Sequence, residues 1–385
     1  MPQESNDRNI TITTPEEVEL LRQLKARDDA DAKRQLRFLD MPDLSRTPGS
    51  PLKALIDLVL AIPVFKNFDD IKIPEIVPAR ESFDLFDFPA NHPARSKSDT
   101  YYVNEEYILR THTTVMWYYY LLSERVKAKL QETDPIGVFS YGKVYRKDEI
   151  DRHHMNTFHQ IDGLYLCRKD QKIIERSDLE EILSTIAKAA FGEDIKYRFN
   201  DDSFPYTYSS VEMEVQKDDK WLEVLGAGVV QPSVLEKLNV DSNVWCGWAF
   251  GFGLERLAII SMELPDIRLL WSTDPRVVSQ LKLGNKFKEV SKYPPITRDV
   301  SFVVKNDFVP NNYFDVIRDL GGDLVEQVEL LDTYENLEKF GADMVSYTYR
   351  ITYRSNERTL TSEEVDAIQH KVYEETAKQF NAAMR

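Results

Sequence analysis

The sequence predicts an α+β protein with two principal domains, and three observations support this. The chain has 385 residues, 42% of them hydrophobic, so it can bury a large core and exceeds the length of one ordinary domain. From residue 101 onward, short strand-like runs alternate with turns and are interrupted by helices, which favours an antiparallel sheet. The tail from residue 291 has a compact order of strands and helices of its own.

The N-terminal part, residues 1–48, is charged and predicts a helical segment followed by a linker. Residues 15–40 carry apolar side chains at loose helical spacing, and Thr14 followed by Pro15 suits a helix start. We expect this helix to pack weakly on the rest of the protein, with an RNA-contacting arm as the alternative. The prolines and the glycine of MPDLSRTPGSP, residues 41–51, indicate the linker.

A larger domain is predicted over residues 49–271. It opens with PLKALIDLVLAI, whose helical periodicity ends near Pro63. Further helices are expected at 113–131, at 178–191 and from Leu254. The expected strands are TYYV, YILRT, FSYGKVYR, DGLYLC, VEMEVQ, WLEVLGAGVV and CGWAFGFG.

Residues 272–290 are expected to connect this domain to a second one at 291–385. The tail begins SKYPPITRDVSFVV and then predicts strand, helix, strand, strand and helix. This succession is the order of a ferredoxin-like module.

Composition narrows the classes of function. The formal charge of -16 argues on average against a nucleic-acid partner, although an acidic protein can carry local basic surfaces. No run of 18 apolar residues occurs, so we expect no membrane span. Cys167 and Cys246 lack zinc or redox spacing and are expected to be plain thiols.

Two segments concentrate groups that could perform chemistry. Five of the six histidines fall between residues 92 and 159, yet no pair has the i, i+4 spacing of a zinc helix, so phosphate and hydroxyl handling is favoured over a metal cage. In WAFGFGLERLAII, residues 248–260, Arg256 stands where a dinucleotide fingerprint needs its third glycine. An arginine at a glycine-rich turn suggests a guanidinium directed at phosphate or stacked on a base.

These segments resemble two signature motifs of class II aminoacyl-tRNA synthetases, and in particular of phenylalanyl-tRNA synthetases. GKVYRKDEIDRHHMNTFHQIDG resembles motif 2, and GWAFGFGLERLAII resembles motif 3. HPARSKSDTYYV, ILRTHTT, WLEVLGAGVV and LPDIRLLWSTDPR match the same family, while KYPPITRDVSF and ITYRSNERTLTSEEV resemble its ferredoxin-fold anticodon-binding domain. The resemblance covers roughly residues 50–385, and it implies an antiparallel-sheet catalytic domain followed by a ferredoxin-like domain.

The resemblance implies ATP-dependent activation of L-phenylalanine, followed by transfer to tRNA(Phe). Arg146, Arg256 and His154 would be catalytic. The residues expected to bind ATP are Arg146, Arg152, His154, Phe158 and Arg256. Glu223 is the candidate ligand for Mg²⁺, since magnesium binds oxygen ligands and bridges phosphates. A strand-end surface acid is the alternative for Glu223.

The resemblance also implies a set of residues for the amino acid. The expected ammonium and carboxylate contacts are His112, Thr114, Gln160 and Asp162, and the expected ring contacts are Phe204, Tyr206, Val229, Ala249 and Gly251. An aromatic turn packed in the core is the alternative for SFPYTY. The sequence departs from the family at Asp162 (usually Glu), Thr114 (usually Ser), Trp117 (commonly polar) and Tyr206 (a Phe), which leaves the exact amino acid open.

For tRNA the expected contacts are Lys292, Arg298, Arg354 and Arg358, with ordinary surface charge as the alternative for each. The domain order resembles the single-chain form of the enzyme, so we expect a monomer without a separate β subunit. The N-terminus has no transit-like character, so we expect a bacterial-type cytoplasmic location, with the mitochondrial matrix as second choice. The alternative functions are activation of another amino acid, use of a non-tRNA acceptor, and RNA binding without catalysis.

Overall fold

A computed structural model describes residues 8–217, 219–289, 293–341 and 343–385. Its chain divides into two compact units. The first unit comprises Met1–Tyr145, Thr157–Glu263 and Lys282–Lys286, and the second comprises Arg146–Asn156, Leu264–Leu281 and Phe287–Arg385. The short loop 146–156 therefore belongs with the C-terminal part of the chain.

Within the described residues, eight strands of the first unit form one sheet in the order β1-β2-β5-β6-β10-β9-β8-β7. The long strands β5, β6, β10, β9, β8 and β7 pair antiparallel, as predicted, while β1–β2 and β2–β5 are parallel. The bounds are β1 Asn9–Thr11, β2 Asp69–Lys72, β5 Ile136–Tyr145, β6 Thr157–Arg168, β7 Tyr197–Asp201, β8 Thr207–Lys217, β9 Lys220–Val230 and β10 Trp245–Gly253.

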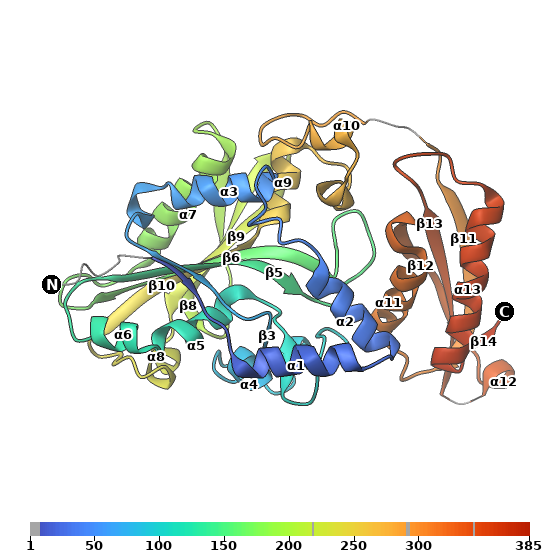
Figure 1. Cartoon of the computed structure of the whole chain (residues 1–385), viewed down its shortest axis with the longest axis horizontal. Helices are drawn as coiled ribbons and strands as arrows, with labels where there is room; N and C mark the ends of the chain where they lie inside the picture. The colour runs from blue at the N-terminus through green and yellow to red at the C-terminus, as the bar shows by residue number, and fades with distance from the viewer. Residues whose placement is uncertain (1–7, 218, 290–292, 342) are drawn as a thin grey trace. The chain divides into compact units, whose positions relative to one another are not determined.

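Helices cover both faces of this sheet (Figure 1). One face carries α3 (Pro51–Leu60), α7 (Arg176–Phe191) and α9 (Leu254–Met262), which contact one another. The other face carries α4 (Ala79–Phe83), α5 (Met116–Leu121), α6 (Glu124–Lys129) and α8 (Pro232–Lys237). A large apolar core that includes Trp117, Leu164 and Ala249 lies between the sheet and this second group.

The N-terminal segment packs more firmly than expected. Thr14 caps α1 (Pro15–Ala26) by accepting from the backbone N–H of Glu17, as predicted, but a second helix, α2 (Ala30–Asp40), begins at a new cap, Asp29. The two helices bury Leu20, Leu24, Ala32 and Phe38 against the small β3–β4 sheet (Ile76–Pro78 and Tyr107–Leu109). The expectation of a weakly packed helix is wrong because each helix has its own apolar face.

Other expected elements differ in extent. The helix expected at 113–131 is three short pieces: η3 (Thr113–Val115), α5 and α6. Ser123 interrupts it by capping α6 with its hydroxyl. TYYV contributes only an isolated bridge between Tyr102 and Ile108 instead of a strand.

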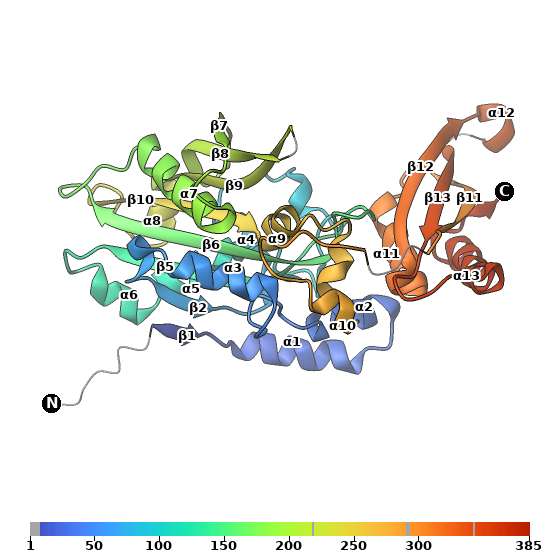
Figure 2. The ribbon, with the colours of Figure 1, turned by 90° about the horizontal axis from the view of Figure 1, so that it is seen from above.

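The C-terminal part of the second unit has the ferredoxin-like order (Figure 2). Among its described residues, four strands pair in the order β12-β13-β11-β14. The elements are β11 (Ile296–Lys305), α11 (Pro310–Gly321), β12 (Val325–Glu335), β13 (Met344–Tyr353), α13 (Ser362–Phe380) and the short β14 (Ala383–Met384). The remaining helical segments of the chain are η1 Pro63–Phe65, η2 Pro93–Arg95, η4 Ile267–Trp271, α10 Pro275–Val278, η5 Gly322–Leu324 and α12 Leu337–Phe340.

Candidate active site

The two central strands β6 and β10 bring the predicted amino-acid contacts together. In their antiparallel register Gln160 lies opposite Gly253, Asp162 opposite Gly251, and Leu164 opposite Ala249. Alternate residues of a strand face the same side of the sheet, so Gln160 and Asp162 share one face. A Cβ at Gly251 would stand 2.7 Å from Asp162 Oδ1, so only glycine leaves room for this carboxylate.

Two adjacent hydroxyls hold the Asp162 carboxylate. Thr114 Oγ1 donates to Asp162 Oδ1 at 2.7 Å, and Thr113 Oγ1 donates to Oδ2. Both threonines are buried in the turn η3, and Asp162 is 6% exposed. Sequence reasoning included Thr114 but missed Thr113, although the run THTT places the two hydroxyls side by side. Both donors are neutral hydroxyl groups, so neither of these two contacts is an ion pair.

Gln160 offers an acceptor on the same face as Asp162. Its Oε1 atom is buried, and within the described residues it has no hydrogen-bond partner. A buried amide oxygen without a donor is costly unless a ligand supplies one. The pair formed by Gln160 and Asp162 therefore suits a group that donates several hydrogen bonds and carries positive charge, such as an ammonium.

Aromatic rings close one side of this site. The Tyr206 ring lies 5.6 Å from Phe86, 6.1 Å from Phe88 and 6.0 Å from Phe204 between centroids. Trp117 is fully buried with its ring 6.0 Å from Tyr206, in an edge-to-face arrangement. His112 extends the cluster, with its ring 5.7 Å from Phe86 and its Nε2 3.1 Å from the Ser82 carbonyl oxygen. The segment FPYTY is therefore half-buried beside other aromatics.

Val229 and Ala249 lie on neighbouring strands, but their side chains face opposite sides of the sheet, because Val229 pairs with Trp248, the neighbour of Ala249. The expectation that the Val229 side chain lines the slot beside Ala249 is therefore wrong. Val229 is opposite Trp248 in the β9–β10 ladder, and Ala249, 5% exposed, belongs to the core that includes Trp117 and receives Tyr206. Phe204 packs over β9, where a Cβ at Gly226 would stand 3.0 Å from the ring. Within the first unit, the structure brings the predicted polar and aromatic contacts to neighbouring strands.

Arg256 and Glu223 meet at the start of α9. The Arg256 guanidinium donates to the Glu223 carbonyl oxygen at 3.1 Å and lies 3.4 Å from its carboxylate Oε2. Both side chains are about half exposed, at 51% and 57%. Phe158 is half-buried on β6, two residues before Gln160 and on the same face of the strand. A cation, a carboxylate and an aromatic ring are therefore present in the first unit for an anionic ligand with a planar base.

The carboxylate of Glu223 fits a metal ion only as part of a larger complex. Within the described chain, no three His, Cys, Asp or Glu side chains form a cluster able to hold a metal. Glu214, opposite Glu223 in the β8–β9 ladder, is hydrogen-bonded to Arg198 at 2.5 Å. One or two carboxylates suit Mg²⁺ when substrate phosphates and water complete the coordination.

The loop 146–156 of the second unit carries the other predicted phosphate contacts. Arg152 forms an ion pair with the buried carboxylate of Glu326 on β12. His154 Nδ1 lies 2.9 Å from Asp151 Oδ2. Burial alone would raise the pKa of Asp151, but hydrogen bonds from His154 and from backbone N–H groups lower it to about 2. Arg146, half-buried, joins the base of the loop through its backbone N–H to the Asn156 carbonyl, at 2.9 Å.

This loop is built into the ferredoxin-like module. Ile150 belongs to the module's core, and its carbonyl accepts from the Val328 backbone N–H at 3.0 Å. Arg318 donates to the Asp148 carbonyl at 2.9 Å, and Asn156 to the Asp315 carboxylate at 3.2 Å. The sequence predicted only that side chains of this loop bind ATP. It did not predict these contacts with the module, because they join residues that are far apart in the sequence.

The predicted tRNA contacts in the module are engaged with acidic residues. Arg298 donates to Asp366 at 2.7 Å and Arg354 to Glu326 at 2.8 Å. Arg358 makes a two-pronged contact with Glu364, which lowers the pKa of that carboxyl group to about 2. Lys292 lies outside the described residues.

Two further expectations concern cysteines and membranes. Cys167 and Cys246 are free thiols, and they lie opposite each other on β6 and β10, both buried. Burial raises the pKa of the Cys167 thiol to about 12. Within the described residues, no helix is long and apolar enough to cross a membrane.

Comparison with known proteins identifies both parts of the chain. Residues 39–281 match the family model for the class II core domain of tRNA synthetases, type F, and residues 291–385 match the ferredoxin-fold anticodon-binding domain. The chloroplastic/mitochondrial phenylalanine--tRNA ligase of Arabidopsis thaliana is 39% identical over 83% of this chain and 73% of its own length. The mitochondrial phenylalanine--tRNA ligases of Mus musculus and Saccharomyces cerevisiae are 35% and 33% identical, over 82% and 83% of this chain and 74% and 83% of theirs.

Proposed function

We propose which residues carry out each part of the reaction in this chain. The chain belongs to the phenylalanine--tRNA ligases within the class II tRNA synthetases. The chain is a ligase that joins phenylalanine to tRNA(Phe). The reaction uses ATP to activate the carboxylate of L-phenylalanine, and the adenylate then passes its acyl group to the tRNA. One observation carries the assignment of the amino-acid site: Asp162 and Gln160 present a negative charge and an unpartnered acceptor on one sheet face.

The α-ammonium of phenylalanine binds between the Asp162 carboxylate and Gln160 Oε1. Thr113 and Thr114 orient the carboxylate through neutral hydroxyl groups, and a buried carboxylate favours a cation as its ligand. His112 lies toward the carboxylate of the substrate. The ring of phenylalanine packs against Phe204 and Tyr206, with Ala249 and Gly251 forming the rest of the slot.

The residues proposed to bind ATP come from both signature motifs. The adenine stacks between Phe158 and Arg256, while Arg146, Arg152 and His154 act on the phosphates. Positioned cations stabilise the charge that develops on phosphoryl oxygens as the carboxylate attacks. Glu223 would hold Mg²⁺, which neutralises phosphate charge when bound. Arg152 and His154 each have a protein carboxylate as partner here, so phosphate must replace those partners.

The ferredoxin-like domain binds the tRNA, and Arg298, Arg354, Arg358 and Lys292 are proposed contacts. The core domain and the anticodon-binding domain lie on one chain, which supports a monomer that works without a β subunit.

The expectation of a bacterial-type cytoplasmic location is wrong. Relatives that match most of this chain are named mitochondrial or chloroplastic enzymes, and these names point to the mitochondrial matrix.

One assay series tests the proposal. Pyrophosphate exchange is measured with each of the twenty amino acids, and total tRNA is then charged with the best one. We expect phenylalanine to give the highest exchange rate and charging to depend on tRNA(Phe). Absence of exchange with every amino acid would favour a non-catalytic RNA-binding relative, exchange without charging would favour a non-tRNA acceptor, and preference for tyrosine would overturn the substrate.

A further inference from the structure

His159 stands between two residues of the proposed substrate site but faces the opposite side of the sheet. Phe158 and Gln160 flank it on β6, and neighbouring side chains of a strand point to opposite faces. His159 is 0% exposed, which is rare for a histidine unless its ring nitrogens are hydrogen-bonded. The partners of this ring lie far away in the sequence.

The Glu255 carboxylate binds His159 through both backbone and side chain. The His159 backbone N–H lies 2.9 Å from each carboxylate oxygen, and Nδ1 lies 2.6 Å from Oε1. The β6–β10 ladder ends at the pair Gln160 and Gly253, because the chain turns there into α9. The backbone N–H of His159 therefore has no β10 carbonyl as its acceptor, and the Glu255 carboxylate accepts its hydrogen bond instead.

The other ring nitrogen defines the tautomer of His159. The Leu44 backbone N–H donates to Nε2 at 2.9 Å, so Nε2 is an acceptor and the ring proton is on Nδ1, facing Glu255. Asp43 Oδ1 stands 3.5 Å from Nε2 and accepts from the Ser45 backbone N–H at 3.0 Å. The ring therefore links α9, β6 and the segment around Leu44 in its neutral form.

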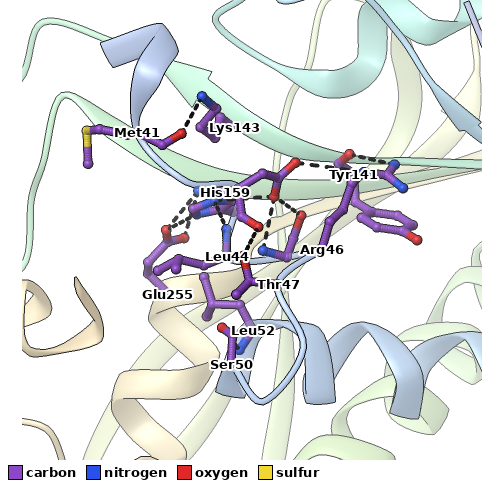
Figure 3. Close-up of polar contacts among 12 residues, drawn as sticks. Met41, Leu44, Arg46, Thr47, Ser50, Leu52, Tyr141, Lys143, His159 and Glu255 are labelled. Atoms are coloured by element: carbon purple, nitrogen blue, oxygen red, sulfur yellow. Dashed lines mark hydrogen bonds and ion pairs between the residues drawn. The ribbon is translucent and has the colours of Figure 1, made fainter. Parts of the chain in front are cut away.

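The segment that contains Leu44 is held at a second point. Lys143, opposite His159 in the β5–β6 ladder, donates its ammonium to the carbonyls of Leu39 and Met41 at 2.6 and 2.7 Å. Arg46 lies over the Tyr141 ring and donates to its carbonyl at 3.2 Å. Figure 3 shows these contacts converging on the sheet beside His159 and Glu255.

We propose that His159 and Glu255 are positioning residues for ATP. Glu255 directly precedes Arg256, so its contact with β6 fixes the turn that carries Arg256 relative to the strand that carries Phe158. This proposal rests on the proposed function, in which the adenine stacks between these two residues. The ammonium site is independent of α9, because Gln160 and Asp162 lie on the same strand and Thr113 and Thr114 hold Asp162. Loss of the pair therefore affects ATP more than phenylalanine.

Three variants test this proposal in the full-length enzyme: Glu255→Gln, His159→Asn and His159→Gln. Asparagine places an amide N–H near the position of Nδ1 and can keep the link to Glu255, while glutamine places an acceptor near Nε2 and can keep the link to Leu44. We expect Glu255→Gln and His159→Gln to raise the KM for ATP at least about 10-fold, since small misplacements of catalytic groups cost up to about 100-fold. The KM for phenylalanine should change less than about 3-fold, and His159→Asn should be closest to wild type.

A second measurement separates this proposal from the assignment of function. Calorimetric titration with ATP alone measures nucleotide affinity without any amino acid or tRNA. Weaker ATP binding in Glu255→Gln would support positioning even if the wild type activated another amino acid. His370→Gln on exposed α13 is the control and should match wild type. Unchanged ATP affinity in folded Glu255→Gln, an equal rise of both KM values, or His159→Asn weaker than His159→Gln would overturn the proposal.

Discussion

The proposed amino-acid site and the loop 146–156 differ in the groups that contact their charged side chains. In the pocket, the hydroxyls of Thr113 and Thr114 bind the Asp162 carboxylate and leave its charge uncompensated by those two contacts. In the loop, carboxylates of the protein already contact the proposed phosphate-binding side chains, since Arg152 pairs with Glu326 and His154 Nδ1 lies 2.9 Å from Asp151 Oδ2. Under the proposed function, the amino-acid site is preorganised for a cation, whereas phosphates would have to displace protein carboxylates to bind Arg152 and His154 in the loop.

The same comparison explains how an acidic chain can serve nucleotide and RNA. The formal charge is -16, and within the described residues the proposed tRNA contacts Arg298, Arg354 and Arg358 each pair with an acid. Exchange of a carboxylate for a phosphate keeps the number of ion pairs constant. The net gain in binding is then modest and depends on salt.

Arg146→Ala is the variant with the largest expected effect. Arg146 belongs to the loop, where we propose that it stabilises charge on the α-phosphate and the attacking carboxylate. Removal of one such electrostatic contact costs about 100-fold or more in turnover. Pyrophosphate exchange measures this loss, and circular dichroism confirms the fold. Exchange near the wild-type rate in a folded variant would remove Arg146 from the mechanism.

Asp162→Asn tests the pocket side of the comparison. The substitution keeps the shape but removes the charge that meets the ammonium, a contact worth about 2 kcal/mol, which corresponds to roughly 30-fold in kcat/KM for phenylalanine. The KM for ATP should change little. Thr114→Ser, which keeps the hydroxyl, is the matched control. Equal loss for both substrates would show that Asp162 is structural and not an ammonium contact.

Ala249→Gly tests the size of the pocket. Ala249 is buried on β10 in the core that contains Trp117, and we propose that its methyl group meets the para position of the substrate ring. Removal of the methyl group should raise the activation of para-chlorophenylalanine relative to phenylalanine by about 10-fold, the scale of a missing methylene in an apolar pocket. The ratio of activation efficiencies in the two enzymes measures this. An unchanged ratio would place Ala249 away from the end of the ring.

The sequence predicted those site residues that lie within a recognisable local pattern or motif. Asp162, Gln160 and Thr114 were expected, and the structure brings the three together on β6 and η3. The link from His159 to Glu255 was not expected, because it spans 96 residues and no spacing rule connects them. The local signal is a histidine in the half of an alternating strand that also carries Ile161, Tyr165 and Cys167.

Missed features elsewhere have similar physical causes. The parallel pairing of β1 with β2 involves strands of three and four residues, which are too short to show periodicity. The partner of Arg152 was missed because Glu326 lies in a region of the sequence that was assigned to tRNA binding. Ion pairs between distant segments depend on tertiary structure, and no pattern in either segment predicts them.

The smallest expected effect concerns the pH dependence of the loop. The pKa of Asp151 is lowered to about 2 in the folded protein, against an ordinary value near 4, so its contacts stabilise the loop fully above about pH 4. This contribution is lost as the pH falls through about 2, because protonation is then equal in both states. The pair is partly exposed, so its worth is at most about 1 kcal/mol.

Hydrogen exchange of residues 146–156 in the wild type and in Asp151→Asn measures this contribution. Other carboxylates titrate over the same range, and the difference between the two proteins cancels their effect. We expect a constant difference in protection between pH 5 and 7 that shrinks below pH 4 and disappears near pH 2. Asp148→Asn is the control, because Asp148 joins the module through its backbone carbonyl, which the substitution keeps. A difference that grew on acidification would mean that the folded loop stabilises the protonated form of Asp151. The charge of Asp151 would then not be what stabilises the loop.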